Sequence, residues 1–186
     1  MKKLNLGCGY DKRLGFVNAD NFMECEPDIL CDLESFPWPF SDGEFDYILM
    51  KHVLEHVGSE FPVFKQIMQE LYRIVAPNGV IEIHVPHFSH WSFWSDPTHV
   101  RGFTDTTFRM MSKKQNDLWK ARGEGYSMLA YMMNVDFDLV EAIQVYDHAW
   151  LKREQAGEIT RSQLRDAALA NWGVVRELQI KISPVK

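Results

Sequence analysis

The stretch "LNLGCGY", residues 4–10, places a hydrophobic run directly before two glycines near the start of the chain. The hydrophobic run predicts a short buried strand, and the glycines predict the loop that follows it. Glycine lets the backbone pass close to a ligand, because it has no Cβ. Ligands of open α/β sheets bind at the carboxyl ends of the strands. The stretch therefore predicts a ligand-binding loop, with Tyr10 at the position where nucleotide-binding loops often carry a third glycine.

Further strands follow this loop. "FVNAD" (16–20) predicts a second strand, and "FDYILMK" (45–51) predicts a third with the hydrophobic density of a parallel strand covered on both faces. Hydrophobic residues recur at helical spacing over 60–75, and "APNG" ends that helix. "VIEIHVP" (80–86) then has the β propensity of another strand.

The second half of the chain is less regular. Residues 87–104 show no period and predict an irregular aromatic loop without a helix, whereas 105–134 predict mostly helical or mixed structure. Strands are predicted over 137–146 and 174–182, with a helix over 159–172 between them. Strands that alternate with helices early on, followed by a strand pair, predict an α/β fold around a mostly parallel sheet.

Composition excludes several classes of protein. The chain has 186 residues, enough for one domain, and a formal net charge of -6, which argues against a broad nucleic-acid footprint. It contains no apolar run long enough to cross a bilayer. The three cysteines form no CxxC pair, so neither a disulfide framework nor a cysteine zinc site is expected. A reducing cytoplasm is the expected location.

Polar residues follow the second strand and the segment after it. Asp20 ends the second strand, where a carboxylate can accept hydrogen bonds from both hydroxyls of a ribose. Asp32 and Leu33 form a polar-then-apolar step that can hydrogen-bond and cover an adenine ring. Together with the glycine loop, these residues predict a nucleoside-shaped pocket.

These motifs, taken in order, resemble those of the class I S-adenosylmethionine-dependent methyltransferases, in particular the type 11 group. The resemblance covers about the first half of the chain. It is carried by "LNLGCG", "VNAD", "CDLESFPWPFSDGEFDYILMKHVLEHV" and "ELYRIVAPNGVIEIHVP". It implies a Rossmann-like sheet of seven strands whose last strand is antiparallel, with S-adenosylmethionine as the cofactor.

The resemblance also implies a set of cofactor-binding residues. Gly7 and Gly9 would pass beside the methionine part of the cofactor, Asp20 would hold the ribose, and Asp32 with Leu33 would meet the adenine. The full expected set is Gly7, Cys8, Gly9, Asp20, Asn21, Asp32, Leu33, Lys51 and His52.

The loop departs from the family pattern in two ways. Tyr10 replaces the frequent third glycine, and only residues 10–16 separate the loop from the second strand. A parallel crossover usually needs about a dozen residues including a helix, so the first crossover helix must be shortened to one turn or missing. Both departures argue against the rival prediction, a nicotinamide-dependent oxidoreductase. A non-catalytic binding or scaffold protein of the same fold is the other alternative, and Asp20 speaks against it.

Methyl transfer requires chiefly that the acceptor be aligned with the sulfonium carbon and shielded from water. A general base is needed where the acceptor is a poor nucleophile, such as a sugar hydroxyl. The candidate bases are His52, His87 and His99. His56 lies four residues after His52 and is expected to brace the structure.

Residues 87–134 are expected to form the acceptor side of the single domain, 1–186. Aromatic faces beside a carboxylate, an imidazole and a guanidinium suit a small polyhydroxylated acceptor, with a sugar hydroxyl in glycan or related biosynthesis as the leading class. The expected acceptor residues are His87, Trp91, Trp94, Asp96 and Arg101. An equally weighted alternative is that Asp96 and Arg101 pair with each other for structure.

Two further features leave alternatives open. His84, His87, His90 and His99 with Asp96 offer enough ligands for a metal, but no HxxxH pattern lies on a clear helix, so no metal is expected. The stretch "YSMLAYMM" (126–133) is expected to be core, although an acceptor wall or an oligomer contact is also compatible with it.

Overall fold

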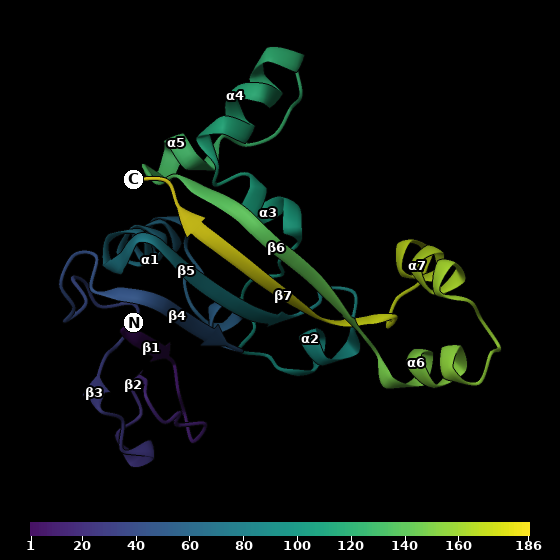
Figure 1. Ribbon diagram of the computed structural model, residues 1–186, viewed down its shortest axis with the longest axis horizontal. Coiled ribbons are helices and arrows are strands. Elements are labelled where there is room, and N and C mark those ends of the chain that lie inside the picture. Colours follow the sequence, from purple (N-terminus) through teal and green to yellow (C-terminus); the bar gives the residue numbers. More distant parts are fainter.

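The computed structural model describes residues 1–186 and contains one seven-stranded sheet in the order β3-β2-β1-β4-β5-β7-β6 (Figure 1). The strands are β1 (Lys3–Leu6), β2 (Val17–Asp20), β3 (Ile29–Leu30), β4 (Phe45–Lys51), β5 (Val75–Pro86), β6 (Phe137–Tyr146) and β7 (Val175–Pro184). The helices are η1 (Met23–Cys25), η2 (Leu54–His56), α1 (Phe61–Ile74), α2 (Trp91–Ser95), α3 (Asp105–Arg109), α4 (Lys113–Arg122), α5 (Leu129–Met133), α6 (His148–Gln155) and α7 (Arg161–Ala170).

Strand pairing confirms the predicted fold class. β1 pairs in parallel with β2 and β4, β2 with β3, and β4 with β5. β7 is antiparallel to both β5 and β6. The sheet is therefore mostly parallel with an antiparallel last strand. Because β1, β2 and β4 run the same way, their carboxyl ends meet at one edge.

The first crossover contains no helix, which is one of the two predicted alternatives. Two buried asparagines hold its turns in place of a helix. Asn5 Nδ2 donates to the carbonyl of Asp11 and to Asn18 Oδ1, and Asn18 Oδ1 also accepts from the backbone N–H of Arg13. Side-chain amides thus satisfy backbone groups that a helix would have satisfied internally.

Helix α1 supplies most of the core on one face of the sheet. The spacing of its apolar residues places one stripe against the strands. Glu60 precedes the helix and Pro62 lies in its first turn, where a backbone N–H has no partner within the helix and its absence in proline therefore costs little. The buried stripe consists of Phe64, Ile67, Met68, Leu71 and Ile74. These side chains join Ile81 and Ile83 of β5 in the main hydrophobic cluster.

The successive residues Ile48, Leu49 and Met50 of β4 are all buried, as expected of a strand covered on both faces, but the part of the sheet formed by β7 and β6 has one face without a helix. In Figure 1 no helix lies in front of β7 and β6, and α1 lies behind the sheet. The uncovered face carries a polar network: Glu82 accepts from Tyr47 Oη at 2.8 Å and lies 2.7 Å from His84 Nε2. Lys181 adds a cation 3.8 Å from Glu82. An antiparallel sheet face can meet water in this way, because polar and apolar side chains alternate along its strands.

The prediction of a helix-free segment over 87–104 was also wrong. Residues 91–95 form α2, which begins at His90, whose side chain accepts a hydrogen bond from the backbone N–H of Ser92. A helix of five residues is too short to show a helical period in its hydrophobic residues, so the sequence pattern did not predict it. The helical prediction for 105–134 is confirmed by α3, α4 and α5. Within 126–133, Ala130 and Met133 are buried and Tyr131 is exposed.

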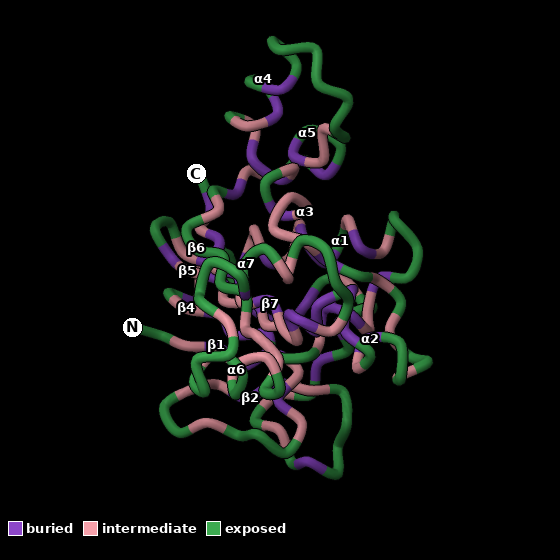
Figure 2. The backbone as a smooth tube through the Cα atoms, turned by 90° about the vertical axis from the view of Figure 1, so that its right-hand side faces the viewer, coloured by how far each residue is buried: buried purple, intermediate pink, exposed green.

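Helices α6 and α7 project beyond the ends of β6 and β7 as an arm (Figure 1). In Figure 2 the backbone of α4, at the tip of a second projection, also runs largely through exposed and half-buried residues. No helix in the structure is long and apolar enough to span a membrane.

Candidate functional site

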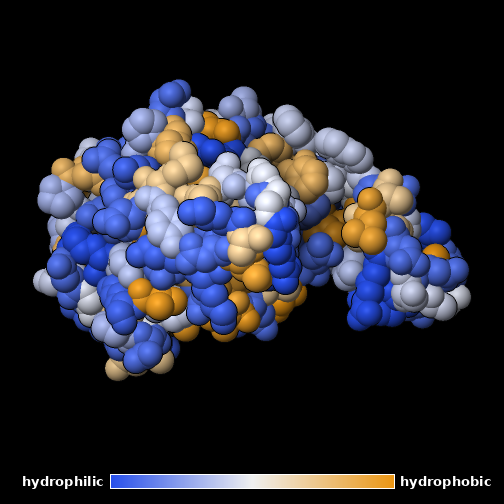
Figure 3. Space-filling model, turned by 90° about the horizontal axis from the view of Figure 1, so that it is seen from above, coloured by the Kyte–Doolittle hydropathy of each residue, from blue (hydrophilic) through white to orange (hydrophobic).

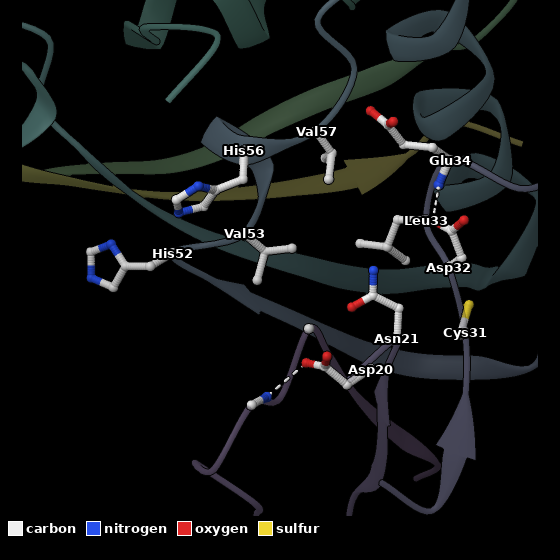
Figure 4. Close-up of a pocket in the computed structure, with 12 residues that line it drawn as sticks. Asp20, Asn21, Cys31, Asp32, Leu33, Glu34, His52, Val53, His56 and Val57 are labelled. Carbon is white, nitrogen blue, oxygen red and sulfur yellow. Dashed lines mark hydrogen bonds between the residues drawn. The ribbon is translucent and has the colours of Figure 1, made fainter. Parts of the chain in front are cut away.

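A cavity of about 500 Å³ opens at the carboxyl ends of β1, β2 and β4, within the size range of ligand pockets. Four segments line it: the loop after β1, the loop after β2, the segment after β3, and η2 with its flanks (Figure 4). The lining residues are Gly7, Gly9, Asp20, Asn21, Cys31, Asp32, Leu33, Glu34, His52, Val53, His56 and Val57.

The two glycines of the loop have different surroundings. Both adopt the left-handed region, with φ of 72° at Gly7 and 47° at Gly9. A Cβ on Gly7 would overlap the γ-carbons of Val53, so glycine allows β1 and η2 to approach each other. A Cβ on Gly9 would meet no atom within 4 Å and would instead project into open space at the cavity. Gly9 therefore keeps room for a ligand.

Asp20 lies between the first loop and the end of β2. Its Oδ2 accepts from the backbone N–H of Gly9 at 2.7 Å (Figure 4). Its Oδ1 accepts from the backbone N–H of Phe22 at 2.9 Å. A carboxylate has about four lone-pair positions, so each oxygen can accept one more hydrogen bond. The geometry suits the vicinal hydroxyls of a ribose.

Asp32 and Leu33 form the opposite wall. Asp32 is held by the backbone N–H of Glu34 at 3.0 Å and by Ser35 Oγ at 2.8 Å. Leu33 is buried, and its carbonyl accepts from the indole of Trp38. A fixed acceptor beside an apolar side chain fits the edge and face of an adenine ring. These observations show that the residues present fit an adenosyl group.

Two residues of the expected cofactor set lie outside the cavity lining. Cys8 is buried, and burial together with neighbouring Cys25 raises its pKa to about 11. Lys51 points to solvent with its Nζ 3.4 Å from Asp11. Because successive side chains on a strand or extended loop alternate in direction, residues adjacent to a lining residue can face away from it.

His52 lines the cavity between two carboxylates. Its Nε2 lies 3.0 Å from Glu177 of β7, and its Nδ1 lies 3.3 Å from Glu55. Glu177 and Glu55 raise the pKa of His52 to about 9, and His52 in turn lowers the pKa of Glu177 to about 2. A protonated imidazole is the opposite of what a general base requires at neutral pH.

His87 is also unsuited to the base role predicted for it. The side chain is buried, burial lowers its pKa, and its Nδ1 lies 2.8 Å from Ser89 Oγ. It does not line the cavity. Its backbone N–H donates to the carbonyl of Arg176 in β7, so His87 holds the segment that follows β5 against β7.

The alternative pairing of Asp96 with Arg101 does not form. Asp96 Oδ1 accepts from the backbone N–H and the hydroxyl of Thr98, in an Asx turn. The Arg101 guanidinium donates to the carbonyl of Gly58 at 2.8 Å and lies 4.4 Å from the ring centroid of Phe64. Arg101 thus ties this loop to the start of α1, and neither residue lines the cavity.

The aromatic residues expected at the acceptor lie outside the cavity. Trp91 and Trp94 are exposed, and Trp94 stacks on Trp172 with ring centroids 6.4 Å apart. Figure 3 shows hydrophobic residues beside the hollow between the body and the lobe formed by α6 and α7.

Sequence reasoning missed several lining residues after β4. Val53, His56 and Val57 follow the strand in "KHVLEHV", where the short helix η2 turns their side chains toward the loop of β1. Glu34 was also missed: its Oε1 accepts from the backbone N–H of Gly58 at 2.7 Å and closes the cavity on that side. The apolar character of the two valines directly after a buried strand was the available signal.

The metal-ligand set considered from the sequence does not assemble. His84 pairs with Glu82 on the uncovered face of the sheet, and His90 lies 3.4 Å from Asp147 at the start of α6. His99 lies instead beside His56, with ring centroids 4.6 Å apart. The histidines are therefore distributed over three regions.

Comparison with protein families finds a match for part of the chain. Residues 18–83 match the family described as the methyltransferase domain. A search of curated proteins found no match.

Solved structures share the fold. A SAM-dependent methyltransferase from Archaeoglobus fulgidus is 12% identical, with a TM-score of 0.62 over 98% of this chain and 85% of that one. A chain from the complex of the Haloferax volcanii Trm112 methyltransferase activator is 11% identical, with a TM-score of 0.56 over 100% and 83%. The [4+2]-cyclase SpnF is 14% identical, with a TM-score of 0.54 over 100% and 76%.

At these identities the structural likeness shows the fold alone, and the cyclase shows that one fold can serve other reactions. The family match spans the second strand through most of the fifth, and therefore the segments that build the cavity beyond the glycine loop. Residues 18–83 of the 186-residue chain therefore resemble a methyltransferase domain, and the whole chain shares the fold of these solved structures.

Proposed function

We propose that this protein transfers a methyl group from S-adenosylmethionine to an oxygen or nitrogen of a small-molecule acceptor, with a sugar hydroxyl as the leading class. The observation that carries the proposal is the carboxylate of Asp20, fixed by two backbone N–H groups at the edge of the cavity. Bound S-adenosylmethionine supplies an electrophilic methyl group. The protein must orient that group and exclude water around it.

Each wall of the cavity has a role in this proposal. Asp20 holds the ribose, and Asp32 with Leu33 holds the adenine. Gly9 leaves room for the methionine part of the cofactor. The acceptor approaches the end lined by Val53 and His56, which follow β4.

The acceptor wall is assigned to residues 87–134, together with the arm that faces α2. The exposed indoles of Trp91 and Trp94 support a polyhydroxylated acceptor, because flat aromatic faces bind the apolar faces of sugar rings. Of the three histidines predicted as bases, His52 lines the cavity but is held by two carboxylates. Neither His87 nor His99 lines the cavity, but His99 contacts the lining residue His56. We therefore assign removal of a hydroxyl proton to the His99 side.

Cofactor binding and turnover of an Asp20→Asn variant test this function. Removing the charge should weaken S-adenosylmethionine binding about 10- to 100-fold, the effect of losing charge-assisted hydrogen bonds. The exposed Asp166 of α7 provides a matched control, Asp166→Asn, which should bind normally. Calorimetry measures the affinity, and thermal unfolding without ligand verifies the fold of each variant.

Three results would contradict the proposal. The first is stabilisation by NAD but not by S-adenosylmethionine. The second is equal cofactor affinity in Asp20→Asn and the wild type. The third is the absence of demethylated cofactor after incubation with panels of sugar and amine acceptors, which would leave cofactor binding without methyl transfer. Alanine variants of His52, His87 and His99 test the base separately, since turnover should fall most for His99.

A further inference from the structure

Glu55, His56 and His99 form a cluster at the acceptor end of the cavity. One carboxylate oxygen of Glu55 and one ring nitrogen of each histidine lie within 4.8 Å of one another. Glu55 and His56 belong to η2, whereas His99 comes from the loop after α2. The backbone N–H of Val100 donates to the carbonyl of Glu55 at 2.8 Å and brings the two segments together.

The carboxylate of Glu55 lacks a full set of partners. The residue is completely buried, and neither oxygen has a hydrogen bond within the protein. Oε1 lies 3.3 Å from His52 Nδ1 and forms an ion pair with it, but the geometry is not that of a hydrogen bond. Oε2 has no hydrogen-bond donor in the protein. Burying an ionised carboxylate costs free energy unless a cation or donor compensates it. Oε2 therefore has lone pairs that no protein group uses and that a positively charged ligand could take.

Both imidazoles are oriented by hydrogen bonds at Nδ1. His99 Nδ1 lies 2.7 Å from the carbonyl of Phe93, which can only accept, so Nδ1 carries the proton. His56 Nδ1 lies 2.8 Å from Thr98 Oγ1, and that hydroxyl donates to Asp96 at 2.6 Å. Thr98 therefore accepts from His56. In each ring the remaining nitrogen, Nε2, carries the lone pair that can bind a metal.

This arrangement matches the environment of metal-binding histidines. Such histidines usually donate their second ring N–H to a carbonyl, carboxylate or other acceptor, which fixes both the tautomer and the ring orientation. A carbonyl performs this function for His99, and the Thr98–Asp96 pair performs it for His56. Asp96 thus has a role in this cluster although it does not touch the cavity.

We propose that Glu55, His56 and His99 bind a divalent first-row transition metal ion, with Zn²⁺ as the first ion to test. Two imidazole nitrogens and one carboxylate oxygen are the protein ligands of many catalytic zinc and non-haem iron sites, which keep open positions for substrate. Ligands about 2.1 Å from a tetrahedral ion lie about 3.4 Å apart, so ligand atoms separated by up to 4.8 Å would move closer by up to about 1.4 Å.

The site adjoins the cavity, because His56 belongs to both. If the proposed function holds, an open position on the ion would bind the acceptor hydroxyl, and His99 would act as a ligand in place of a base. Binding of the acceptor hydroxyl by the ion depends on the proposed function, but binding of the ion itself does not. A failure of metal binding is therefore distinguishable from a failure of the proposed methyl transfer.

A second group of possible ligands provides an internal comparison. Cys8, Asp20 and Cys25 also bring ligand atoms within 4.8 Å of one another. Both oxygens of Asp20 already accept backbone hydrogen bonds, and the thiol of Cys25 donates to the carbonyl of Phe22 at 2.9 Å. This group is satisfied within the protein, so it lacks the vacant acceptor that Glu55 has.

The test is calorimetric titration of the full chain with Zn²⁺ after removal of metal by a chelator. We expect one equivalent to bind, with affinity reduced at least about 100-fold in Glu55→Gln and His99→Gln. Thr98→Val, which removes the hydrogen bond that orients His56, should weaken binding about 10- to 100-fold. Cys25→Ser and His84→Gln are controls that should bind normally. Folding of each variant is verified by circular dichroism.

The absorption spectrum of the Co²⁺ complex gives an independent readout. Imidazole and carboxylate ligands should produce visible d–d bands without a thiolate charge-transfer band. Normal Zn²⁺ binding by folded His99→Gln and Thr98→Val would overturn the proposal, as would loss of binding in Cys25→Ser or no binding to the wild type. If Glu55→Gln does not fold, the other two variants still decide the question.

Discussion

Gly7 and Gly9 both lie in the left-handed φ region, yet they serve different purposes. At Gly7 the missing Cβ allows the side chain of Val53 to pack on the loop, whereas at Gly9 it leaves cavity space open. A single substitution to alanine at each position should therefore separate stability from cofactor binding.

We expect Gly7→Ala to reduce the free energy of unfolding by about 2–4 kcal/mol, because left-handed strain and overpacking against Val53 add together. Gly9→Ala should cost only about 1–2 kcal/mol, from strain alone, but should weaken S-adenosylmethionine binding more than its loss of stability explains. Urea unfolding and calorimetry measure the two quantities. Equal losses of stability in the two variants would contradict this assignment.

At the scale of residues, the cofactor wall was more predictable than the acceptor wall. Asp20, Asp32 and Leu33 follow strand ends, so the topology alone brings them to one edge of the sheet. Asp96 and Arg101 bind a hydroxyl and a distant carbonyl that no local pattern indicates. The cluster of Glu55 with His99 likewise depends on a backbone contact between segments over forty residues apart.

At the scale of elements, one ionic network joins α1 to the loop before β4. Glu70 Oε2 accepts from the backbone N–H of Trp38 at 2.7 Å and from Arg73, which also donates to the carbonyl of Phe40. Burial alone would raise the pKa of Glu70, but the hydrogen bonds from Arg73 and Trp38 overcome it and lower the pKa below 4.5. The network therefore stabilises the fold in its ionised state.

The sign of the pH effect follows from this lowered pKa. The contribution of Glu70 to stability is complete above its unfolded pKa of about 4.5 and is lost as pH falls through the lower folded pKa. We expect Glu70→Gln to be about 1–3 kcal/mol less stable than the wild type at pH 7, with the difference shrinking below pH 4.5. Urea unfolding across pH measures it.

Asp42→Asn is the matched control, because Asp42 contacts the same Arg73 from an exposed position and should contribute little. A difference between wild type and Glu70→Gln that stayed constant from pH 7 to pH 3 would show that the effect is not ionic.

The same scale shows why some elements escaped prediction. Helix α1 and strands β6 and β7 have clear periods, and their observed bounds lie within two residues of the predicted ones. Strand β3 has two residues, and α6 buries no residue, so neither carries a hydrophobic period. Both exist because neighbouring parts of the chain hold them, β3 by pairing with β2 and α6 by its capping residue Asp147.

At the scale of the whole molecule, the arm of α6 and α7 is inserted between β6 and β7. These two strands form an antiparallel hairpin that a short turn could join in place of the arm. Tyr146 and Val175 are paired in the β6–β7 ladder, and the backbone N–H of Asp147 donates to the carbonyl of Val174. Antiparallel strands joined in this way need only a short turn. Within the two helices, only Leu164 is buried.

We therefore expect replacement of residues 149–172 by a short glycine-rich turn to leave one cooperative unfolding transition, with a free energy of unfolding changed by less than about 1 kcal/mol. Phe137→Ala, at the fully buried start of β6, should cost about 3–5 kcal/mol in the same assay. The shortened chain should retain its S-adenosylmethionine affinity, since no residue of the arm lines the cavity.

Turnover should fall if the arm forms part of the acceptor wall, because the contact between Trp94 and Trp172 is lost. Failure of the shortened chain to fold would instead make the arm part of the hydrophobic core, and unchanged turnover would remove it from the acceptor site.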